Sequence, residues 1–299
     1  MDTVWRPSFP VDVACTLGPL SRGRYDPTHQ VQAGSLWRTT VTPGGAASYR
    51  LTQHGPREIA CSAWGDGAEW VLASLPDLLG ARDAPEDFEA RHPLLARTHA
   101  AHPGLRIPRT NRVFEALAPA ILEQKVTGKQ ARSAFRRLVL QYGDEPPGPV
   151  PEGMRLPPAP EVWRRIPSWD WHRAGVDPQR SRTLIAASRL SPRLEEAATM
   201  APAQALARLQ AVPGVGEWTA AEVAVCALGD ADALSVGDYH VAAFVGWALL
   251  GRPVDDAGMV ELLEPWRPHR GRVIRLLELS GASKPKFGPR MTIQDHRRG

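Results

Sequence analysis

Along the first 80 residues, apolar and β-branched side chains occur in short runs separated by turns rich in glycine and proline. The turns include Pro43-Gly-Gly and His54-Gly-Pro, and this spacing is typical of a small antiparallel sheet. An amphipathic stretch over 68–79, closed by Gly80, then predicts one helix. The predicted strands cover 11–17, 35–41, 48–52 and 58–63. We therefore expect an α+β domain over residues 1–80.

After Pro108 the apolar positions recur with a helical period almost throughout. A stretch rich in proline and glycine, 145–160, is predicted to be a long surface loop, since helical patterns continue beyond it. The predicted helices cover 111–124, 129–142, 160–166, 178–190, 202–212, 217–228, 239–250, 256–264 and 269–280. The predicted fold class is mainly α, with an all-helical region over 81–283. Residues 284–299 are basic and poor in apolar side chains, which predicts a flexible tail.

Composition narrows the class of protein. A chain of 299 residues favours two domains, and a net charge of +4 fits a phosphate-rich partner without requiring one. The cysteines, Cys15, Cys61 and Cys226, are dispersed without a CxxC pair, so no zinc site, iron–sulfur cluster or other metal site is expected. No signal peptide or membrane-spanning stretch is evident, and a cytoplasmic protein is expected.

The segment 202–228 places two helical apolar stripes on either side of a short turn. Pro213 ends the first helix, while Gly214 and Gly216 give the turn backbone freedom and let another chain approach closely. The stripes consist of Leu206, Leu209 and Val212 before the turn, and of Ala220, Val223, Ala224 and Ala227 after it. This pattern predicts a tight helical hairpin.

The turn of this hairpin has the properties of an anion site. The backbone N–H groups of Gly214, Val215 and Gly216 are predicted to face outward beside the start of the second helix, which carries Thr219. A DNA phosphate fits there without any basic side chain. The alternative is an ordinary helix–helix turn that holds two glycines.

A carboxylate follows the hairpin at a short distance along the chain. Asp238 comes 22 residues after Gly216, behind Gly237, and is predicted to open a helix that runs to Leu250. An aspartate at this position is an N-cap in most proteins. The two roles are compatible, because a helix start fixes the direction of the side chain and so suits a catalytic carboxylate.

The hairpin over 209–221, followed at this interval by Gly237-Asp238, resembles the signature of the helix-hairpin-helix DNA glycosylase superfamily. Segments 102–108, 121–124 and 264–270 are similar to its alkylpurine branch, which includes bacterial 3-methyladenine DNA glycosylase II. The resemblance covers most of 100–280. It implies the removal of an alkylated purine, of the 3-methyladenine or 7-methylguanine type, from damaged double-stranded DNA during base excision repair.

In the mechanism that the resemblance implies, Asp238 lies beside a flipped nucleotide and stabilises the positive charge that develops on the sugar. Trp218 and Tyr239 are the candidates for stacking on the base, with core packing as the alternative. In relatives that also cut the strand, a lysine at the position of Trp218 forms a Schiff base. Tryptophan has no amine, so base removal without lyase activity is expected.

Two positions depart from the alkylpurine pattern. Lys125 stands where relatives carry an apolar residue that fills the space left in the base stack. Gln124 or another residue is therefore the alternative candidate for filling that space. Gln124 and Lys125 are both candidate DNA contacts. Arg275 stands in the last helix, where relatives often place an aromatic side chain, and this leaves the breadth of the pocket open. Segment 266–270 is interpreted as structural.

Three functions remain open at this point. The first is an alkylpurine glycosylase, the second a glycosylase for deaminated or oxidised bases, and the third a non-catalytic DNA-binding module. Asp238 favours the two enzymes, because a binding hairpin needs no carboxylate downstream. A monomer is expected. No cofactor is expected, although the resemblance allows for a monovalent cation where the hairpin contacts a phosphate.

Overall fold

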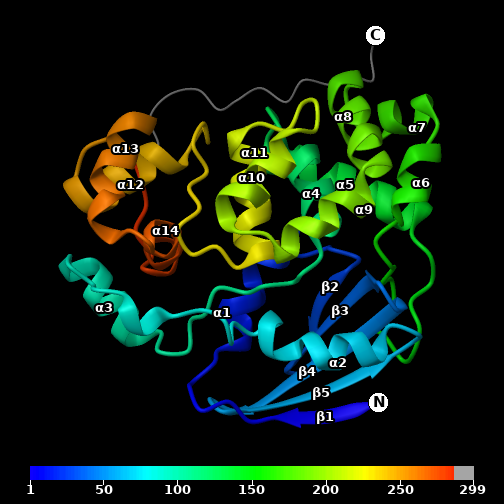
Figure 1. Cartoon of the computed structure of the whole chain (residues 1–299), viewed down its shortest axis with the longest axis horizontal. Coiled ribbons are helices and arrows are strands. Elements are labelled where there is room, and N and C mark those ends of the chain that lie inside the picture. The colour runs from blue at the N-terminus through cyan, green and yellow to red at the C-terminus, as the bar shows by residue number, and fades with distance from the viewer. Residues whose placement is uncertain (286–299) are drawn as a thin grey trace.

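The computed structural model describes residues 1–285 of the 299-residue chain, and these residues form one small sheet and fourteen α-helices. The mainly helical fold with a small antiparallel sheet is confirmed (Figure 1). Most of the tail predicted over 284–299 lies outside the described residues. The strands are β1 (Asp2–Trp5), β2 (His29–Gln32), β3 (Ser35–Thr42), β4 (Gly45–Gly55) and β5 (Glu58–Trp64). The helices are α1 (Val13–Leu17), α2 (Ala68–Leu78), α3 (Pro93–Ala101), α4 (Val113–Glu123), α5 (Gly128–Tyr142), α6 (Pro160–Arg165), α7 (Ser168–Arg173), α8 (Pro178–Arg189), α9 (Ser191–Glu195), α10 (Pro202–Gln210), α11 (Glu217–Val223), α12 (Val241–Leu250), α13 (Asp256–Leu263) and α14 (Arg270–Leu279).

The five strands pair antiparallel in the order β1-β5-β4-β3-β2. The hairpin of β3 and β4 turns at Pro43 and Gly44 and keeps its register from Thr42 opposite Gly45 to Ser35 opposite Thr52. α2 lies across the sheet (Figure 1). Alternation along β4 and β5 buries Leu51 and Ile59 in the same core as the inner side of α2.

The prediction of a strand over 11–17 was wrong, because this segment contains α1. The carboxylate of Asp12 accepts the N–H of Cys15 at 2.8 Å and caps the helix, and Val13, Thr16 and Leu17 are buried on one side. The outer strands β1 and β2 were not predicted. Each pairs on one side only and is mostly exposed, so neither shows the run of apolar residues that marks an inner strand.

Helices occur at all nine predicted places after Pro108, but two short helices in this region, α7 and α9, were missed, as was α3 before it. The predicted helix over 217–228 is α-helical only in its first part, α11, and continues as a π-helical turn over Ala224–Leu228. α4 begins at Val113, two residues after the predicted start. There the carboxylate of Glu195 accepts the N–H groups of Val113 and Phe114 at 2.9 and 3.1 Å and caps the helix from a distant part of the chain.

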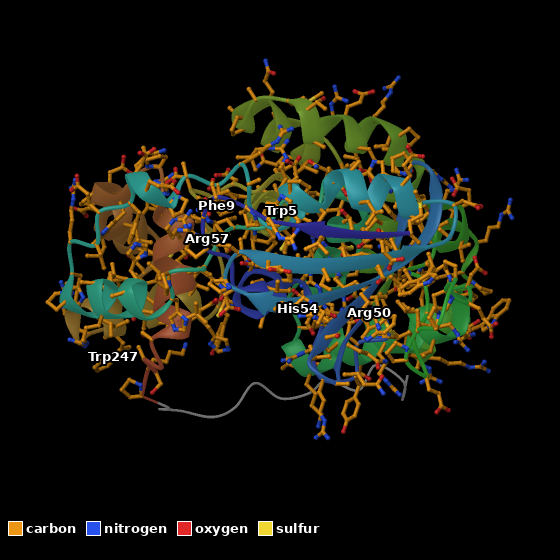
Figure 2. All side chains as sticks on the ribbon, turned by 90° about the horizontal axis from the view of Figure 1, so that it is seen from below. Trp5, Phe9, Arg50, His54, Arg57 and Trp247 are labelled. Carbon is orange, nitrogen blue, oxygen red and sulfur yellow. The ribbon has the colours of Figure 1, made fainter. Side chains whose placement is uncertain are left out.

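The predicted loop over 145–160 contains no helix or strand up to residue 159, where α6 follows, and it lies against the sheet. Arg155 donates its N–H to Pro27 at 2.8 Å, and Thr39 donates its hydroxyl to the carbonyl of Arg155 at 2.6 Å. Beside β1, Trp5 and Phe9 contact each other edge to face (Figure 2). The guanidinium of Arg106 stacks on the Phe9 ring, 3.9 Å from its centroid. These contacts fix the sheet to the helical part of the chain.

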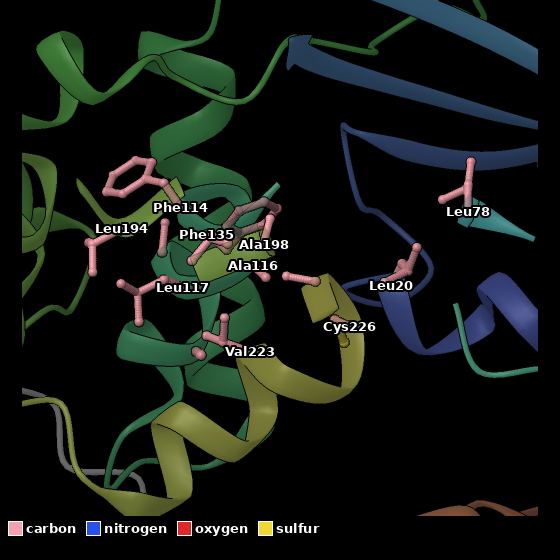
Figure 3. Close-up of a cluster of buried hydrophobic side chains, with 14 of the residues drawn as sticks. Leu20, Leu78, Phe114, Ala116, Leu117, Phe135, Leu194, Ala198, Val223 and Cys226 are labelled. Atoms are coloured by element: carbon pink, nitrogen blue, oxygen red, sulfur yellow. The ribbon is translucent and has the colours of Figure 1, made fainter. Parts of the chain in front are cut away.

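Buried side chains form two clusters. The larger joins the sheet to α4, α5, α8, α10 and α11, and Figure 3 shows Leu117 of α4 near Val223 of α11. The smaller joins α3 to α12, α13 and α14 and includes Leu234. The hairpin therefore belongs to the first cluster. The segment that carries Asp238 leads from the first cluster into the second.

Candidate active site

The predicted hairpin connects α10 to α11. Leu209 and Val212 before the turn are buried, and Val215 within it is buried and donates its N–H to the carbonyl of Val212 at 2.9 Å. Its two glycines differ in their surroundings. Gly214 has a φ of +90°, and a Cβ there would lie 2.2 Å from the hydroxyl of Thr183, whereas the space around Gly216 is open. Gly214 is therefore required by the fold, and Gly216 leaves the outer surface of the turn accessible.

Gln124 connects the end of α4 to this hairpin. Its side-chain amide donates to the carbonyl of Gly214 at 2.9 Å and to the hydroxyl of Thr219 at 2.8 Å. The next residue, Lys125, has a φ of +55°, in the left-handed region that few non-glycine residues adopt. Gln124 thus positions the turn.

Asp238 precedes α12 rather than opening it. The helix begins at Val241, so the predicted start at 239 was two residues early. The Oδ1 atom of Asp238 nevertheless accepts the N–H groups of His240 and Val241, at 2.7 and 3.0 Å, as a capping aspartate does. Gly237, with a φ of +88°, turns the chain immediately before it. The carboxylate is therefore held by the backbone that follows it.

The other carboxylate oxygen faces α11. Trp218 donates its indole N–H to the Oδ2 atom of Asp238 at 3.2 Å. Tyr239, next to the carboxylate, is 74% exposed, and its ring meets that of His240 edge to face with the centroids 4.8 Å apart. An exposed aromatic ring of this size next to a fixed carboxylate is suited to contact a ligand rather than to fill a core.

One cleft, with a volume of about 740 Å³, brings these residues together. All nine predicted site residues line it, and they come from three separate segments: Gln124, Lys125, Gly214, Val215, Gly216, Trp218, Thr219, Asp238 and Tyr239. These nine residues provide backbone N–H groups, an amide, a lysine, two aromatic rings and a carboxylate. Such a surface can hold an anionic strand at the hairpin and a ring at Trp218 and Tyr239.

The part of the cleft that α8 provides was not predicted from the sequence. Asp177 and Arg180 line it, and the carboxylate of Asp177 accepts from the guanidinium of Arg180 at 2.6 Å. Arg180 also donates to the carbonyl of Leu122 at 2.7 Å and so holds the end of α4. Burial opposes ionisation of Asp177, but the hydrogen bonds and charge of Arg180 outweigh it and lower the pKa of this carboxyl. The Asp177-Pro178 pair is typical of a helix start, but nothing in the sequence indicated that Arg180 pairs with Asp177.

The segment before Asp238 is held by α14. The carboxylate of Asp232 accepts two hydrogen bonds from the guanidinium of Arg270, at 2.9 and 2.6 Å, and forms an ion pair with Arg267 at 3.2 Å. Trp266 donates its indole N–H to the carbonyl of Glu89 at 3.0 Å. Segment 266–270 therefore has the structural contacts that its sequence indicates, and it fixes the approach to the carboxylate.

Arg275, which marks a departure from the alkylpurine pattern, lies outside this cleft. It pairs with Glu278 at 2.9 Å and donates to the carbonyl of Cys15 at 3.1 Å. Within residues 1–285, no helix is long and apolar enough to cross a membrane.

No family model matches the chain. Among curated proteins, it is 29% identical over 251 residues to the Mycobacterium tuberculosis protein named Probable bifunctional transcriptional activator/DNA repair enzyme AlkA. The match covers 81% of this chain and 49% of that protein, so the chain spans about half the length of the curated relatives it matches.

Two solved structures of DNA glycosylases share the fold of this chain. A 3-methyladenine DNA glycosylase from Archaeoglobus fulgidus has a TM-score of 0.78 and 19% identity, over 93% of this chain and 98% of that one. An 8-oxoguanine glycosylase/lyase from Clostridium acetobutylicum has a TM-score of 0.71 and 15% identity, over 94% and 96% of the two chains. The resemblance stated from the sequence is confirmed: the chain is homologous to the AlkA-type protein and has the fold of the helix-hairpin-helix glycosylases.

Proposed function

We propose that this homologue of AlkA, with its helix-hairpin-helix glycosylase fold, is a monofunctional DNA glycosylase that removes alkylated purines from duplex DNA. The observation that carries the proposal is the cleft in which Asp238, Trp218 and the hairpin meet. A DNA-binding module would have the hairpin, but it would have no use for a carboxylate fixed beside it.

The first step is the binding of the strand. A phosphate docks on the N–H groups of the hairpin, where the open space around Gly216 lets the backbone approach. Lys125, at the edge of the same cleft, adds a positive charge toward the phosphates. These contacts are with the backbone, so they position any sequence alike. The lesion is then extruded toward Asp238.

The second step is cleavage of the bond between the base and the sugar. Positive charge develops on the sugar as the base departs, and the ionised carboxylate of Asp238 stabilises it and orients a water molecule. Its hydrogen bonds from Trp218, His240 and Val241 hold both oxygens in place, so no reorganisation is needed during the reaction. An alkylated purine is already cationic and leaves without a strong general acid.

Trp218 and Tyr239 are proposed to contact the extruded nucleotide through their ring faces. A cationic base on an aromatic ring gains about 0.5–2 kcal/mol. Trp218 also explains why no strand cleavage is proposed, since its indole nitrogen cannot form the Schiff base on which lyase chemistry depends.

The test is release of free base from methylated duplex DNA by the full chain, compared with Asp238→Asn. We expect the variant to lose at least about 1000-fold in the single-turnover rate while DNA affinity changes little, because the carboxylate acts on the transition state. The exposed Asp144 supplies a matched control, and Asp144→Asn should release base at the rate of the wild type.

Two results would contradict the proposal. If the wild type released no base from methylated DNA but bound it, the non-catalytic binding module would be favoured. If it released only deaminated or oxidised bases, the proposed glycosylase activity would be supported, but the proposed alkylpurine substrate would be contradicted.

A further inference from the structure

One short part of the sequence carries the whole positive excess of the chain. The chain has 36 lysines and arginines against 32 acidic residues, a net charge of +4 with the histidines neutral. Residues 284–299, the basic segment, contain five of these basic residues and one acidic residue, so 31 of each sign remain in residues 1–283. The five are Lys284, Lys286, Arg290, Arg297 and Arg298. The basic segment thus carries +4, and the rest of the chain is neutral.

The charged side chains of the cleft do not attract a polyanion. Three acidic and two basic residues line it, namely Glu123, Asp177, Asp238, Lys125 and Arg180. Arg180 is buried and pairs with Asp177 at 2.6 Å. The N–H groups of the hairpin bind an anion only at short range, since the effect of such dipoles falls off within about one helical turn. Attraction of DNA from a distance therefore requires charges outside the cleft.

The basic segment begins at the edge of this cleft. Nζ of Lys284 donates to Nδ1 of His240 at 2.9 Å and lies 6.0 Å from the centre of the Tyr239 ring. The backbone N–H of His240 in turn donates to Oδ1 of Asp238 at 2.7 Å. Two hydrogen bonds thus connect the first residue of the segment to the carboxylate that we propose to be catalytic.

The contact between Lys284 and His240 can be exchanged for a phosphate. It is exposed to solvent, and Lys284 forms no ion pair with any of the residues 1–285. An exposed pair of this kind contributes about 0–1 kcal/mol. A phosphate oxygen carries negative charge and accepts a stronger hydrogen bond from an ammonium than a ring nitrogen does. Lys284 therefore has more to gain from a DNA strand than from His240.

The basic segment is long enough to follow such a strand. Its residues can span up to about 55 Å, at about 3.4 Å for each residue. The phosphates of one DNA strand also recur about every 3.4 Å along the helix axis. A fraction of this reach takes the five positive charges past several phosphates on one side of the lesion.

We infer that the basic segment binds the phosphates of the DNA strand beside the cleft and supplies most of the electrostatic attraction between this chain and DNA. The inference rests on the proposed function, which makes duplex DNA the partner. Each phosphate that a lysine or arginine neutralises releases a condensed cation from the DNA, and this release favours binding. The hairpin then contacts a strand that the basic segment has already brought to the surface.

The test measures binding to an undamaged duplex, so that it does not depend on catalysis. The segment variant is the full chain with Arg290→Gln, Arg297→Gln and Arg298→Gln, and fluorescence anisotropy compares it with the wild type over a range of salt concentrations. Each phosphate contact contributes about 0.9 to the slope of log affinity against log salt concentration. We expect the segment variant to flatten this slope by about 2–3 and to weaken binding about a hundredfold at about 0.1 M salt.

Two controls separate the place of the charge from its amount. The body variant combines Arg57→Gln, Arg97→Gln and Arg165→Gln, which are exposed arginines in the turn after β4, on α3 and at the end of α6. It removes as much positive charge as the segment variant and should keep the slope of the wild type. Changing the three arginines of the segment variant to lysine keeps their charge, so this variant should also keep the slope.

The inference is overturned if the segment variant keeps the slope and affinity of the wild type, since the basic segment would then not contact DNA. It is also overturned if the body variant loses as much, since only the net charge would then matter. Failure of the proposed function looks different, because the wild type would bind DNA with a slope that depends on the basic segment but would release no base from methylated duplexes. If both proposals hold, the segment variant should release base at the wild-type single-turnover rate once DNA is saturating, because the segment contacts the backbone rather than the reacting atoms.

Discussion

The indole N–H of Trp218 and the Oδ2 atom of Asp238 are 3.2 Å apart, and this hydrogen bond joins the helix that follows the hairpin to the carboxylate 20 residues further along the chain. The opposite oxygen is held by the backbone N–H groups of His240 and Val241. The carboxylate plane is thereby fixed from two sides, by a side chain of α11, whose buried residues belong to the first core cluster, and by the start of a helix of the second. The alignment of the carboxylate that we propose to be catalytic therefore depends on how these two clusters meet.

Replacing Trp218 by phenylalanine keeps an aromatic face and removes the hydrogen bond. Because a hydrogen bond to a charged group contributes about 1.5–3 kcal/mol, we expect Trp218→Phe to slow single-turnover base release by about ten- to a hundredfold with little change in DNA affinity. Trp169 is 61% exposed and remote from the cleft, so Trp169→Phe is the control and should have no effect. Wild-type rates in Trp218→Phe would show that the bond does not orient Asp238.

Borohydride trapping tests the absence of lyase chemistry. The wild type should give no covalent adduct with methylated duplex DNA, since the residues proposed to lie at the sugar, Trp218 and Asp238, have no primary amine, and the amines of Lys125 and Lys284 are assigned to the phosphates. Trp218→Lys places an amine beside the carboxylate and is expected to give a trappable adduct. This variant is the positive control that residue 218 lies within reach of the sugar. An adduct with the wild type would contradict the assignment of a monofunctional enzyme.

The hairpin and the position of Asp238 could be predicted from the sequence because both are local. Two apolar stripes around Pro213 and Gly214 specify a helical hairpin, and Gly237-Asp238 specifies a turn into a helix, whatever surrounds them. Folding then brings the segments into one cleft. A short edge strand such as β2 gave no comparable signal, because its four residues pair on one side only.

The rest of the site depends on contacts between distant residues, which no local pattern contains. Glu195 caps α4 from 82 positions away, and Gln124 reaches the hairpin across 90. Such roles require the tertiary structure.

Gln124 provides a test of how the hairpin is held. Gln124→Ala removes the donors to the carbonyl of Gly214 and to Thr219, and at about 1 kcal/mol for each neutral hydrogen bond we expect about 2 kcal/mol less stability. DNA affinity should fall equally for all sequences, because we propose that the turn contacts the DNA backbone rather than the bases. Urea unfolding and DNA titration measure the two effects, and a loss confined to particular sequences would contradict them. Gln141→Ala, whose side chain is exposed on α5, is the control.

Asp177 makes the stability of the cleft wall depend on pH. Its pKa is lowered in the folded protein, so its contribution is fully present above the ordinary carboxyl pKa of about 3.9 and is lost as the pH falls through the lower folded value. Asp177→Asn keeps the helix cap but leaves Arg180 without its ion pair, and should cost about 1–3 kcal/mol at neutral pH.

The difference between Asp177→Asn and the wild type should shrink in acid, and urea unfolding at neutral pH and below pH of about 4 measures it. Asp255 caps α13 without an ion pair to any residue that the structure describes, so Asp255→Asn should change stability little at either pH. A cost for Asp177→Asn that stayed constant into acid would show that the charge on Asp177 does not stabilise Arg180.

The two glycines of the hairpin should respond oppositely to the same substitution. Gly214→Ala adds a Cβ 2.2 Å from the hydroxyl of Thr183 at a φ of +90°, so it should cost about 1–3 kcal/mol of folding stability. Gly216→Ala meets no atom within 4 Å and should leave stability unchanged. It places a methyl group where we propose that a phosphate approaches, so it should weaken binding to all DNA sequences about tenfold. Thermal unfolding and DNA titration separate the two effects, with Gly55→Ala in β4, also in open space, as the control. If Gly216→Ala bound DNA as the wild type does, the phosphate would have to dock elsewhere on the cleft. The proposal that the DNA strand runs from the hairpin turn to Asp238 would then be contradicted.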